Sequence, residues 1–337
     1  MNRTVPALLI TLVAAASLGA CGGSSSSELT IYSGRTQELV EPLLDQFAKE
    51  TGIDIAVRYG DSADLAVLID TEGDASPADV FFSQSPGAIG FLDTQPRLVE
   101  LPANVLERVP EQFRASDGDW VGVSGRVRVI VYNADEIDDS EVPNSVFDLT
   151  DPEYRGRVGV APTNGSFQDF VTIMRSMRGD EATLEWLTAM RENGVRTYPN
   201  NIAVREAVER GEIDFGLANH YYNEQAKAED PETPTENHYL DGADPGAAIL
   251  TAAVGVLDTA GDQSENAQRL VEFLLSQEAQ EYFARETFEY PLASGVDPVG
   301  DLPPLDSIAT PQVDLSGLGG GLQRTRELIR DSGLESA

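Results

Sequence analysis

Apolar and polar positions form a repeated strand and helix pattern in the first third of the chain. Leu29-Thr30-Ile31-Tyr32 predicts a strand, and residues 37–49 predict a helix with one apolar face, made of Leu39, Val40, Leu43, Leu44 and Phe47. Residues 53–59 alternate as a second strand, 64–70 have helical spacing, and 78–82 predict a buried strand. Close alternation of strands and helices is typical of a parallel sheet with right-handed crossovers.

Two long apolar runs, residues 121–132 and 248–257, lack helical spacing and predict strands that cross between two lobes. Further strand and helix patterns lie between these runs and predict a second α/β unit. We therefore expect an α/β fold with two lobes joined by two crossing strands. A ligand cleft between the lobes would close by hinge motion. The expected N-terminal lobe comprises residues 28–127 plus 253–302, and the expected C-terminal lobe comprises residues 128–252 plus 303–337.

The first 27 residues predict export and attachment to a membrane. Met1-Asn2-Arg3 is basic, and residues 5–18 form an apolar run that suits a signal peptide better than a membrane span. The run ends in Leu18-Gly19-Ala20-Cys21, which resembles a bacterial lipobox, and Cys21 is the one cysteine in the sequence. We expect a signal peptide at 1–20 and a lipidated Cys21 with a flexible tether at 21–27. An ordinary signal peptide with an incidental cysteine is the alternative.

The net charge and the absence of catalytic motifs exclude several classes of function. The chain has 337 residues, enough for two domains with buried cores, and a formal net charge of -34. Nucleic acid is not an expected partner, because phosphate neutralisation needs clustered lysines and arginines. The sequence contains no HExxH, Walker-type or GxSxG motif, so we do not expect an enzyme.

Three loops end a predicted strand and open a predicted helix, which makes each a candidate anion site. They are Ser33-Gly34-Arg35-Thr36, Thr163-Asn164-Gly165-Ser166 and Pro199-Asn200-Asn201. Free backbone N–H groups and the helix dipole favour anions at such places. For any one of these loops taken singly, simple helix capping is the favoured interpretation, because every α/β protein has such turns. Three loops in one chain, with Arg35 in the first, favour a bound oxyanion.

Two adjacent tyrosines, Tyr221 and Tyr222, follow the predicted strand at 213–217 and are candidate metal ligands. A free phenol has a pKa of roughly 10, so only a hard, strongly polarising cation such as Fe(III) removes its proton at neutral pH. The alternative is that both rings stack on an organic ligand or fill a core. The adjacent His220 suits a structural, hydrogen-bonded role, and we assign no role to His238.

Beyond these local patterns, the sequence resembles the ferric-ion-binding receptors of bacterial ABC importers, which have the type II periplasmic-binding-protein fold. The resemblance covers nearly the whole chain after the tether. It rests on five stretches: residues 31–35, residues 72–82, residues 125–129, residues 154–162 and Asn219-His220-Tyr221-Tyr222.

The resemblance implies a ligand set for the site. Tyr221 and Tyr222 would bind Fe(III), with carbonate or phosphate as a synergistic anion. The implied anion site comprises Asn164, Gly165 and Ser166, with Asn200 or Asn201 and Asn219 nearby. Arg35 and Arg126 match arginines that carbonate-binding members use.

The sequence departs from that family at three positions that we expect to line the cleft. Thr36 and Gln84 stand where one branch of the family has a histidine and a glutamate as iron ligands, and Phe167 stands where another branch has a third tyrosine. Two phenolates, a bidentate anion and water can still form an octahedron of hard oxygen ligands. The departures imply weaker iron binding, or binding of iron that is already chelated.

Taken together, the sequence predicts a monomeric receptor, tethered by lipid outside the cell membrane, that binds Fe(III) with an oxyanion and delivers it to an ABC permease. The first alternative is a receptor of the same fold for thiamine, a phosphorylated compound or a polyamine, with the tyrosines and Phe167 stacking on the ligand. The second is an exported enzyme or a partner-binding module on this fold.

Overall fold

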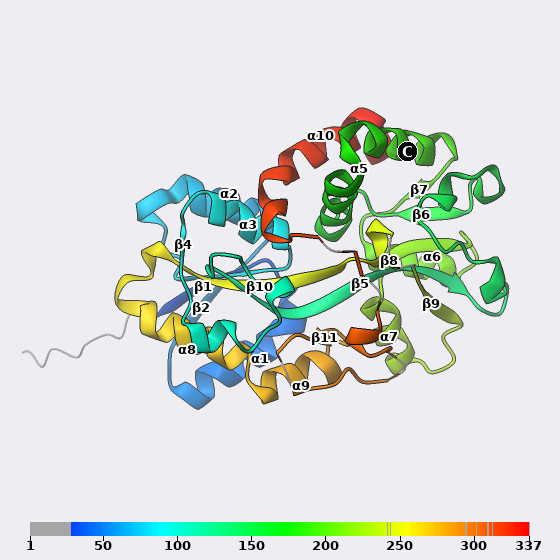
Figure 1. Ribbon diagram of the computed structural model, residues 1–337. Coiled ribbons are helices and arrows are strands. Elements are labelled where there is room, and N and C mark those ends of the chain that lie inside the picture. Colours follow the sequence, from blue (N-terminus) through cyan, green and yellow to red (C-terminus); the bar gives the residue numbers. More distant parts are fainter. Residues whose placement is uncertain are drawn as a thin grey trace, which may run out of the picture.

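The computed structural model describes residues 28–240, 242, 244–293, 295–300, 302–308, 310–311 and 313–336. Two α/β lobes lie left and right of a central pair of long strands (Figure 1). The strand order is β2-β1-β3-β10-β5-β8-β6-β7, with β4 beside β10, and β9 and β11 beside β5. The predicted signal peptide, Cys21 and the tether lie outside the described residues.

The secondary structure agrees with the alternating pattern of the sequence. The strands are β1 (Leu29–Ser33), β2 (Ile55–Tyr59), β3 (Val80–Ser83), β4 (Leu98–Val99), β5 (Val121–Asn133), β6 (Val158–Val160), β7 (Arg196–Thr197), β8 (Phe215–Asn219), β9 (Thr235–Tyr239), β10 (Ile249–Leu257) and β11 (Tyr290–Pro291). The α-helices are α1 (Gln37–Thr51), α2 (Ser62–Glu72), α3 (Pro86–Thr94), α4 (Ala103–Leu106), α5 (Gly165–Glu192), α6 (Asn201–Glu209), α7 (Tyr221–Glu229), α8 (Ser264–Leu274), α9 (Gln277–Arg285) and α10 (Leu322–Ser332).

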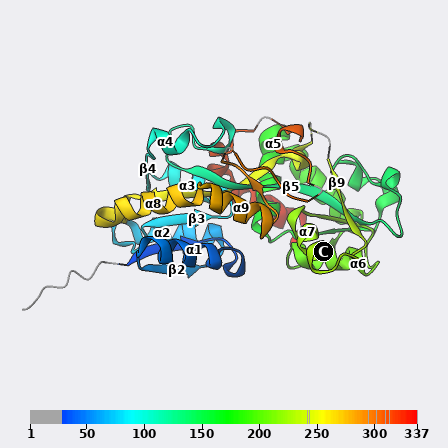
Figure 2. The ribbon, with the colours of Figure 1, turned by 90° about the horizontal axis from the view of Figure 1, so that it is seen from below.

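The first lobe is a mixed sheet with helices on both faces. β1 pairs in parallel with β2 and β3, and β10 pairs with β3 in the antiparallel direction. Helices α2 and α3 cover one face, and α1, α8 and α9 cover the other, as the view from below also shows (Figure 2). The predicted apolar face of α1 is confirmed, since Val40, Leu43, Leu44 and Phe47 are buried in the core. Burial of each such side chain contributes roughly 1.5–3 kcal/mol, so this face anchors α1 to the sheet.

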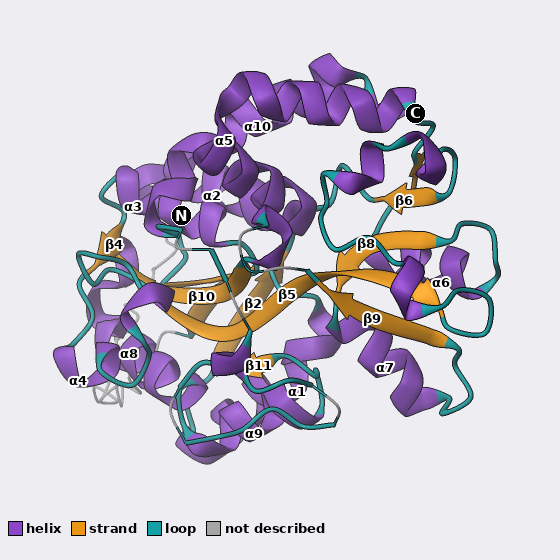
Figure 3. Ribbon diagram, turned by 45° about the vertical axis from the view of Figure 1, so that its right-hand side comes forward, coloured by secondary structure: helices purple, strands orange, loops and turns teal. Residues whose placement is uncertain are grey.

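Strand β5 belongs to both sheets, as predicted for the first long apolar run (Figure 3). Its residues up to Val127 pair with β10, and its residues from Arg128 onward pair with β8 and β9. Among the described residues, the partners of β10 are β3, β4 and β5 of the first sheet, so the chain returns to the first lobe before β10 begins. Residues 249–252, which the expected boundaries assign to the second lobe, therefore lie opposite residues 124–127 of β5 in the first sheet.

The second lobe has a separate core around α5. The helices expected at 167–177 and 181–192 form one element, which is interrupted at Gly179 by non-helical backbone with φ 83°. Phe170, Met174 and Trp186 of α5 are buried against residues of β6 and β8. A positive φ is accessible to glycine without steric cost, so Gly179 allows the chain to turn between the two halves.

The C-terminal segment contacts both lobes. The short helix η9 (Ser316–Gly321) lies beside α3, and Leu318 belongs to the core of the first lobe. α10 lies along α5, and Leu328 belongs to the core of the second lobe (Figure 1). The expected assignment of residues 303–337 to the second lobe therefore fits α10 but not η9. Among the residues that the structure describes, no helix has the length and apolar character needed to cross a membrane.

Candidate functional site

The tyrosine pair lies in the first turn of α7, directly after β8. Tyr221 is 1% exposed and Tyr222 is partly exposed. Their ring centroids are 4.1 Å apart with an angle of 34° between the planes, so the two rings are in contact in a tilted arrangement. Because β8 ends at Asn219, opposite Arg128 of β5, the pair lies beside the strand that joins the lobes.

A cavity of about 490 Å³ lies between the lobes and includes Tyr222 in its wall. Most of the cleft residues expected from the sequence line it: Thr36, Gln84, Asn164, Gly165, Ser166 and Asn200. Among the described residues that line it, the charged ones are Glu38 and Asp61, and none is a lysine, arginine or histidine. The cavity wall therefore carries negative charge, which favours a cationic ligand.

Other predicted site residues lie behind this wall. Arg35, Arg126, Asn201 and Asn219 are at most 2% exposed and do not line the cavity. The expectation that Phe167 lines the cleft is wrong. Its ring is buried in the core of the second lobe, 5.7 Å from the Phe170 ring, and the apolar environment accounts for its position.

Arg35 is held by a carboxylate from a distant part of the chain. Its Nη1 and Nη2 donate to the two oxygens of Glu289, at 2.9 and 2.5 Å, and both side chains are fully buried. Burial opposes ionisation of Glu289, but Arg35 outweighs it and lowers the pKa of Glu289 below its ordinary value. The pair is therefore ionised, and the charge of Arg35 is balanced before any ligand arrives.

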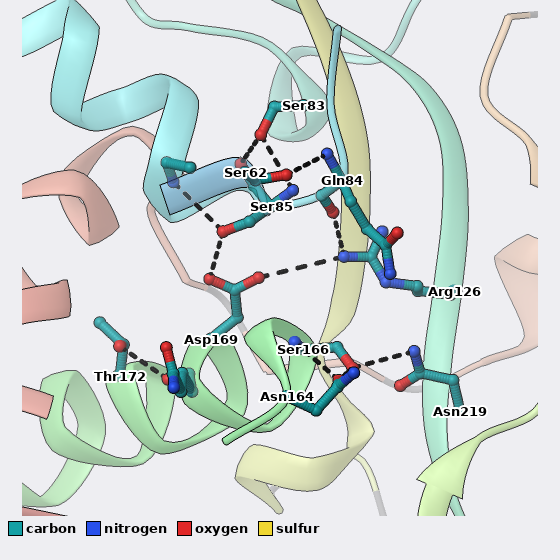
Figure 4. A network of polar contacts seen from close by, with 12 residues as sticks. Ser62, Ser83, Gln84, Ser85, Arg126, Asn164, Ser166, Asp169, Thr172 and Asn219 are labelled. Atoms are coloured by element: carbon teal, nitrogen blue, oxygen red, sulfur yellow. Dashed lines mark hydrogen bonds and ion pairs between the residues drawn. The ribbon is translucent and has the colours of Figure 1, made fainter. Parts of the chain in front are cut away.

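Arg126 lies at the contact between the lobes (Figure 4). Its Nη2 donates to the carbonyl oxygen of Gln84 and lies 4.0 Å from Oδ2 of Asp169 on α5. Oδ1 of Asp169 accepts a 2.6 Å hydrogen bond from Ser85, the residue that caps α3. Nε and Nη1 of Arg126 are buried and have no hydrogen-bond acceptor among the described residues. Buried donors without acceptors are costly, which makes Arg126 a candidate for binding an oxyanion.

The predicted anion loop is brought together at the start of α5, and its side chains bond to one another (Figure 4). Oδ1 of Asn164 accepts from the backbone N–H of Ser166 at 3.1 Å, from Ser166 Oγ at 2.6 Å and from Asn201 at 3.1 Å. Arg128 and Asn219 both donate to Ser166 Oγ, each at 3.2 Å. Asn164 is thus the N-cap of α5, and the capping interpretation of this loop is confirmed.

The third predicted loop, Pro199-Asn200-Asn201, also caps a helix. The side chain of Asn200 accepts a 2.9 Å hydrogen bond from the backbone N–H of Ala203 and caps α6. Several donors that an anion would use at these two loops are therefore already engaged.

The electrostatic environment keeps Tyr221 protonated in the absence of a cation. Burial, and then the neighbouring Tyr222 and Glu289, raise the pKa of Tyr221 well above its ordinary value. Burial, together with the adjacent Arg126, lowers the pKa of Arg128 to about 9. A ligand that makes Tyr221 ionise must therefore supply strong positive charge, which a trivalent metal ion does.

His220 has the structural role that the sequence predicted. It is fully buried, its Nδ1 accepts from the backbone N–H of Val127 at 3.1 Å, and its Nε2 donates to the carbonyl oxygen of Phe288 at 2.9 Å. Burial lowers the pKa of His220 to about 4, so the ring is neutral at pH 7. Phe288 has a φ of 56°, which is unusual for a residue with a bulky side chain. His220 thus ties the segment before Tyr221 to β5 and to the segment that carries Glu289.

Sequence reasoning missed four functional candidates: Glu38, Asp61, Asp169 and Glu289. Asp61 carried a signal, because it lies between a predicted strand and a predicted helix, like the three loops that were singled out. Asp169 and Glu289 carried none, because their partners are 84 and 254 residues away in the sequence.

Comparisons with known proteins give a consistent picture. Residues 75–312 match the family described as bacterial extracellular solute-binding protein. The chain is 32% identical over 332 residues to the Fe(3+)-binding periplasmic protein of Serratia marcescens, covering 98% of this chain and 97% of that one. It is 32% identical to the major ferric iron-binding protein of Neisseria meningitidis, over 92% of this chain and 94% of that one.

Solved structures give the same result for the fold. Iron-bound HitA from Pseudomonas aeruginosa superposes with a TM-score of 0.86 at 33% sequence identity, covering 91% of this chain and 99% of that one. The predicted two-lobed periplasmic-binding-protein fold is confirmed. The chain belongs to the family of bacterial extracellular solute-binding proteins.

Proposed function

We propose that this protein is an extracytoplasmic receptor that binds Fe(III) through Tyr221 and Tyr222 and delivers it to an ABC importer. The observation that carries the proposal is the position of Tyr222 in the wall of an interlobe cavity whose charged lining residues are Glu38 and Asp61, with the buried Tyr221 ring 4.1 Å from the Tyr222 ring. Relatives of about one-third identity are named for ferric iron binding, and one solved structure is iron-bound.

Fe(III) suits this donor set because it prefers hard, anionic oxygen ligands. Burial of Tyr221 makes its phenol reluctant to ionise, so a weakly polarising ion would leave it protonated. Zinc prefers histidine or cysteine, and His220 is engaged with the backbone on both ring nitrogens. The site therefore favours a trivalent ion over the common divalent ions.

We propose carbonate as the synergistic anion, with phosphate as the alternative. Nε and Nη1 of Arg126 are buried and have no acceptor among the described residues, so each could donate to an oxygen of a bound oxyanion. Asn164, Ser166 and Asn201 bond to one another, so fewer of their donors remain for phosphate. Gly165 and Asn219 complete this alternative site, and Arg35 is occupied by Glu289.

The remaining features follow from the sequence and the family. The lipobox at Cys21 supports a lipid anchor on the outer face of the cell membrane, with the ABC permease as the partner. We propose a monomer without catalytic activity, whose lobes are residues 28–127 plus 253–302 and 128–252 plus 303–337, adjusted by the pairing of β10 and η9 described above.

An organic ligand is the alternative function. The acidic cavity argues against a phosphorylated compound, because no cationic side chain lines it among the described residues. Thiamine and polyamines are cations and would satisfy the acidic wall, with Tyr222 stacking on them. Burial of Phe167 removes the third aromatic ring that this alternative expected.

A visible absorption band decides between these ligands. Purified protein mixed with ferric citrate should develop a tyrosinate-to-iron charge-transfer band, and the band should be lost in Tyr221→Phe and Tyr222→Phe. Tyr59→Phe, which changes a tyrosine outside the cavity, should retain it. In carbonate-free buffer the band should be weak and recover with bicarbonate more than with phosphate. A colourless wild-type protein would rule out iron binding through the tyrosines.

A further inference from the structure

Asp61 is fixed at the edge of the cavity by one of its two carboxylate oxygens. It lies between β2 and α2 and is the N-cap of α2. Its Oδ1 accepts from the backbone N–H groups of Ala63 at 2.9 Å and Asp64 at 3.3 Å. These two bonds hold the carboxylate in one orientation.

The other oxygen of Asp61 faces the opposite lobe. Oδ2 lies 4.0 Å from the point where a Cβ would stand on Gly165, the first residue of α5. Asp61 and Gly165 both line the cavity, on the first and second lobe respectively, and Tyr222 lines the same cavity. A carboxylate oxygen of the first lobe thus lies at the cavity that Tyr222 borders.

The cationic neighbour of Asp61 does not neutralise it. Nη2 of Arg326 on α10 lies 3.8 Å from Oδ1, and the two side chains are 41% and 46% exposed. Such exposed ion pairs contribute little to the stability of the folded protein, typically up to about 1 kcal/mol. Arg326 also donates from Nε to Gln168 at 3.0 Å, so it is shared between two partners. The negative charge of Asp61 therefore remains available to a ligand in the cavity.

A carboxylate would strengthen the proposed iron site. Two phenolates supply two negative charges to a trivalent ion, and Thr36 and Gln84, the other lining residues considered as ligands, are neutral. We propose that Asp61 Oδ2 is the third anionic protein ligand of the ferric ion and supplies the first lobe's contribution to the site. This inference rests on the proposed function, because it concerns the same ion.

Asp61 is a better candidate than the second cavity carboxylate. Glu38 lies in the first turn of α1, and no hydrogen bond fixes its carboxylate among the described residues, whereas two backbone N–H groups fix that of Asp61. A preoriented ligand loses less conformational entropy on binding than a free glutamate, which has several rotatable bonds. Because Tyr221 and Tyr222 belong to the second lobe, ligation by Asp61 would also link the two lobes through the ion.

Substitutions that keep the helix cap test the proposal. Asp61→Asn and Asp61→Ser retain a good N-cap, so α2 should fold normally. Asp64→Asn is the matched control, on the neighbouring acidic residue of α2 that does not line the cavity, and Glu38→Gln measures the effect of the other cavity carboxylate. For each variant, iron affinity is measured by competition with citrate, and the charge-transfer band is recorded.

We expect both Asp61 variants to bind iron at least about 100-fold more weakly than the wild type and to show a shifted charge-transfer band. A loss of this size exceeds what is typical for a residue that contacts only the metal ligands. Asp64→Asn should stay within about threefold of the wild type, and Glu38→Gln should lose less affinity than either Asp61 variant. Equal affinity and an unchanged band in the two Asp61 variants would overturn the proposal, as would a loss confined to Glu38→Gln. Absence of the band in the wild type would instead refute iron binding through the tyrosines, so the two failures are distinguishable.

Discussion

Replacing Glu289 by glutamine would remove the charge that balances Arg35 while keeping the shape of the side chain. Both partners are completely buried, and the two oxygens of Glu289 accept from two guanidinium nitrogens at 2.9 and 2.5 Å. The variant would leave a buried guanidinium beside an amide that also carries N–H donors. Removing one partner of a buried pair in this way typically costs about 3–5 kcal/mol.

The pH dependence of this loss has a definite sign. The pKa of Glu289 is lowered in the folded protein, from an ordinary value of 4.5, because Arg35 outweighs the effect of burial. A carboxylate with a depressed pKa stabilises the folded state fully above its unfolded pKa. The difference between the wild type and Glu289→Gln should therefore be constant above pH 4.5 and shrink as the pH falls further.

Urea unfolding of the iron-free protein, followed by circular dichroism, measures this difference. Glu281→Gln is the control, because its pairing with Arg285 at 3.6 Å is half exposed and its loss should cost at most about 0.5 kcal/mol. The double variant Arg35→Met with Glu289→Leu should recover most of the stability, since neither charge remains buried. A Glu289→Gln protein within about 1 kcal/mol of the wild type at pH 7 would refute this account of the pair.

Two further substitutions test the contacts between lobes and tail. Burial raises the pKa of Asp169 to about 6 from 3.8, against the opposing effects of Ser85 and Arg126, so wild-type stability should fall as the pH rises from about 4 to 6. Asp169→Asn should lack this loss. Urea unfolding at pH 4 and pH 8 should show that the free energy of unfolding of the wild type falls by up to roughly 3 kcal/mol more than that of the variant. Gly319→Ala would place a Cβ 2.1 Å from the backbone of Gly90 and should cost about 1–3 kcal/mol or more by thermal melting. Gly317→Ala, whose Cβ would meet nothing closer than 3.6 Å, should change little.

Sequence periodicity predicted the fold because most of its signals are local. The apolar face of α1, the alternation of β2 and the unbroken apolar run of β5 each follow from the spacing of neighbouring residues. Element ends were less accurate. Ala218 and Asn219 belong to β8, because backbone pairing with β5 continues to the end of that strand.

The candidate site was predictable only in part. Tyr221 and Tyr222 are adjacent in the sequence, and their position after a strand was visible there. The Arg35–Glu289 pair joins residues 254 positions apart, and no local pattern marks it. Phe167 was misplaced because sequence spacing cannot tell which face of α5 turns toward the cleft and which toward the core of the second lobe.

Strand β5 belongs to both sheets, so a rotation of one lobe against the other would bend this strand beside the proposed binding site. The partner strand changes between two consecutive residues, Val127 facing β10 and Arg128 facing β8. A rotation of one lobe would change the backbone torsions at these residues. The side chain of Arg126 reaches Asp169, and that of Arg128 reaches Ser166. Opening of the lobes would thereby change the orientation of these arginine side chains near the ligand. Release of the ligand would then begin with a change in the backbone of β5.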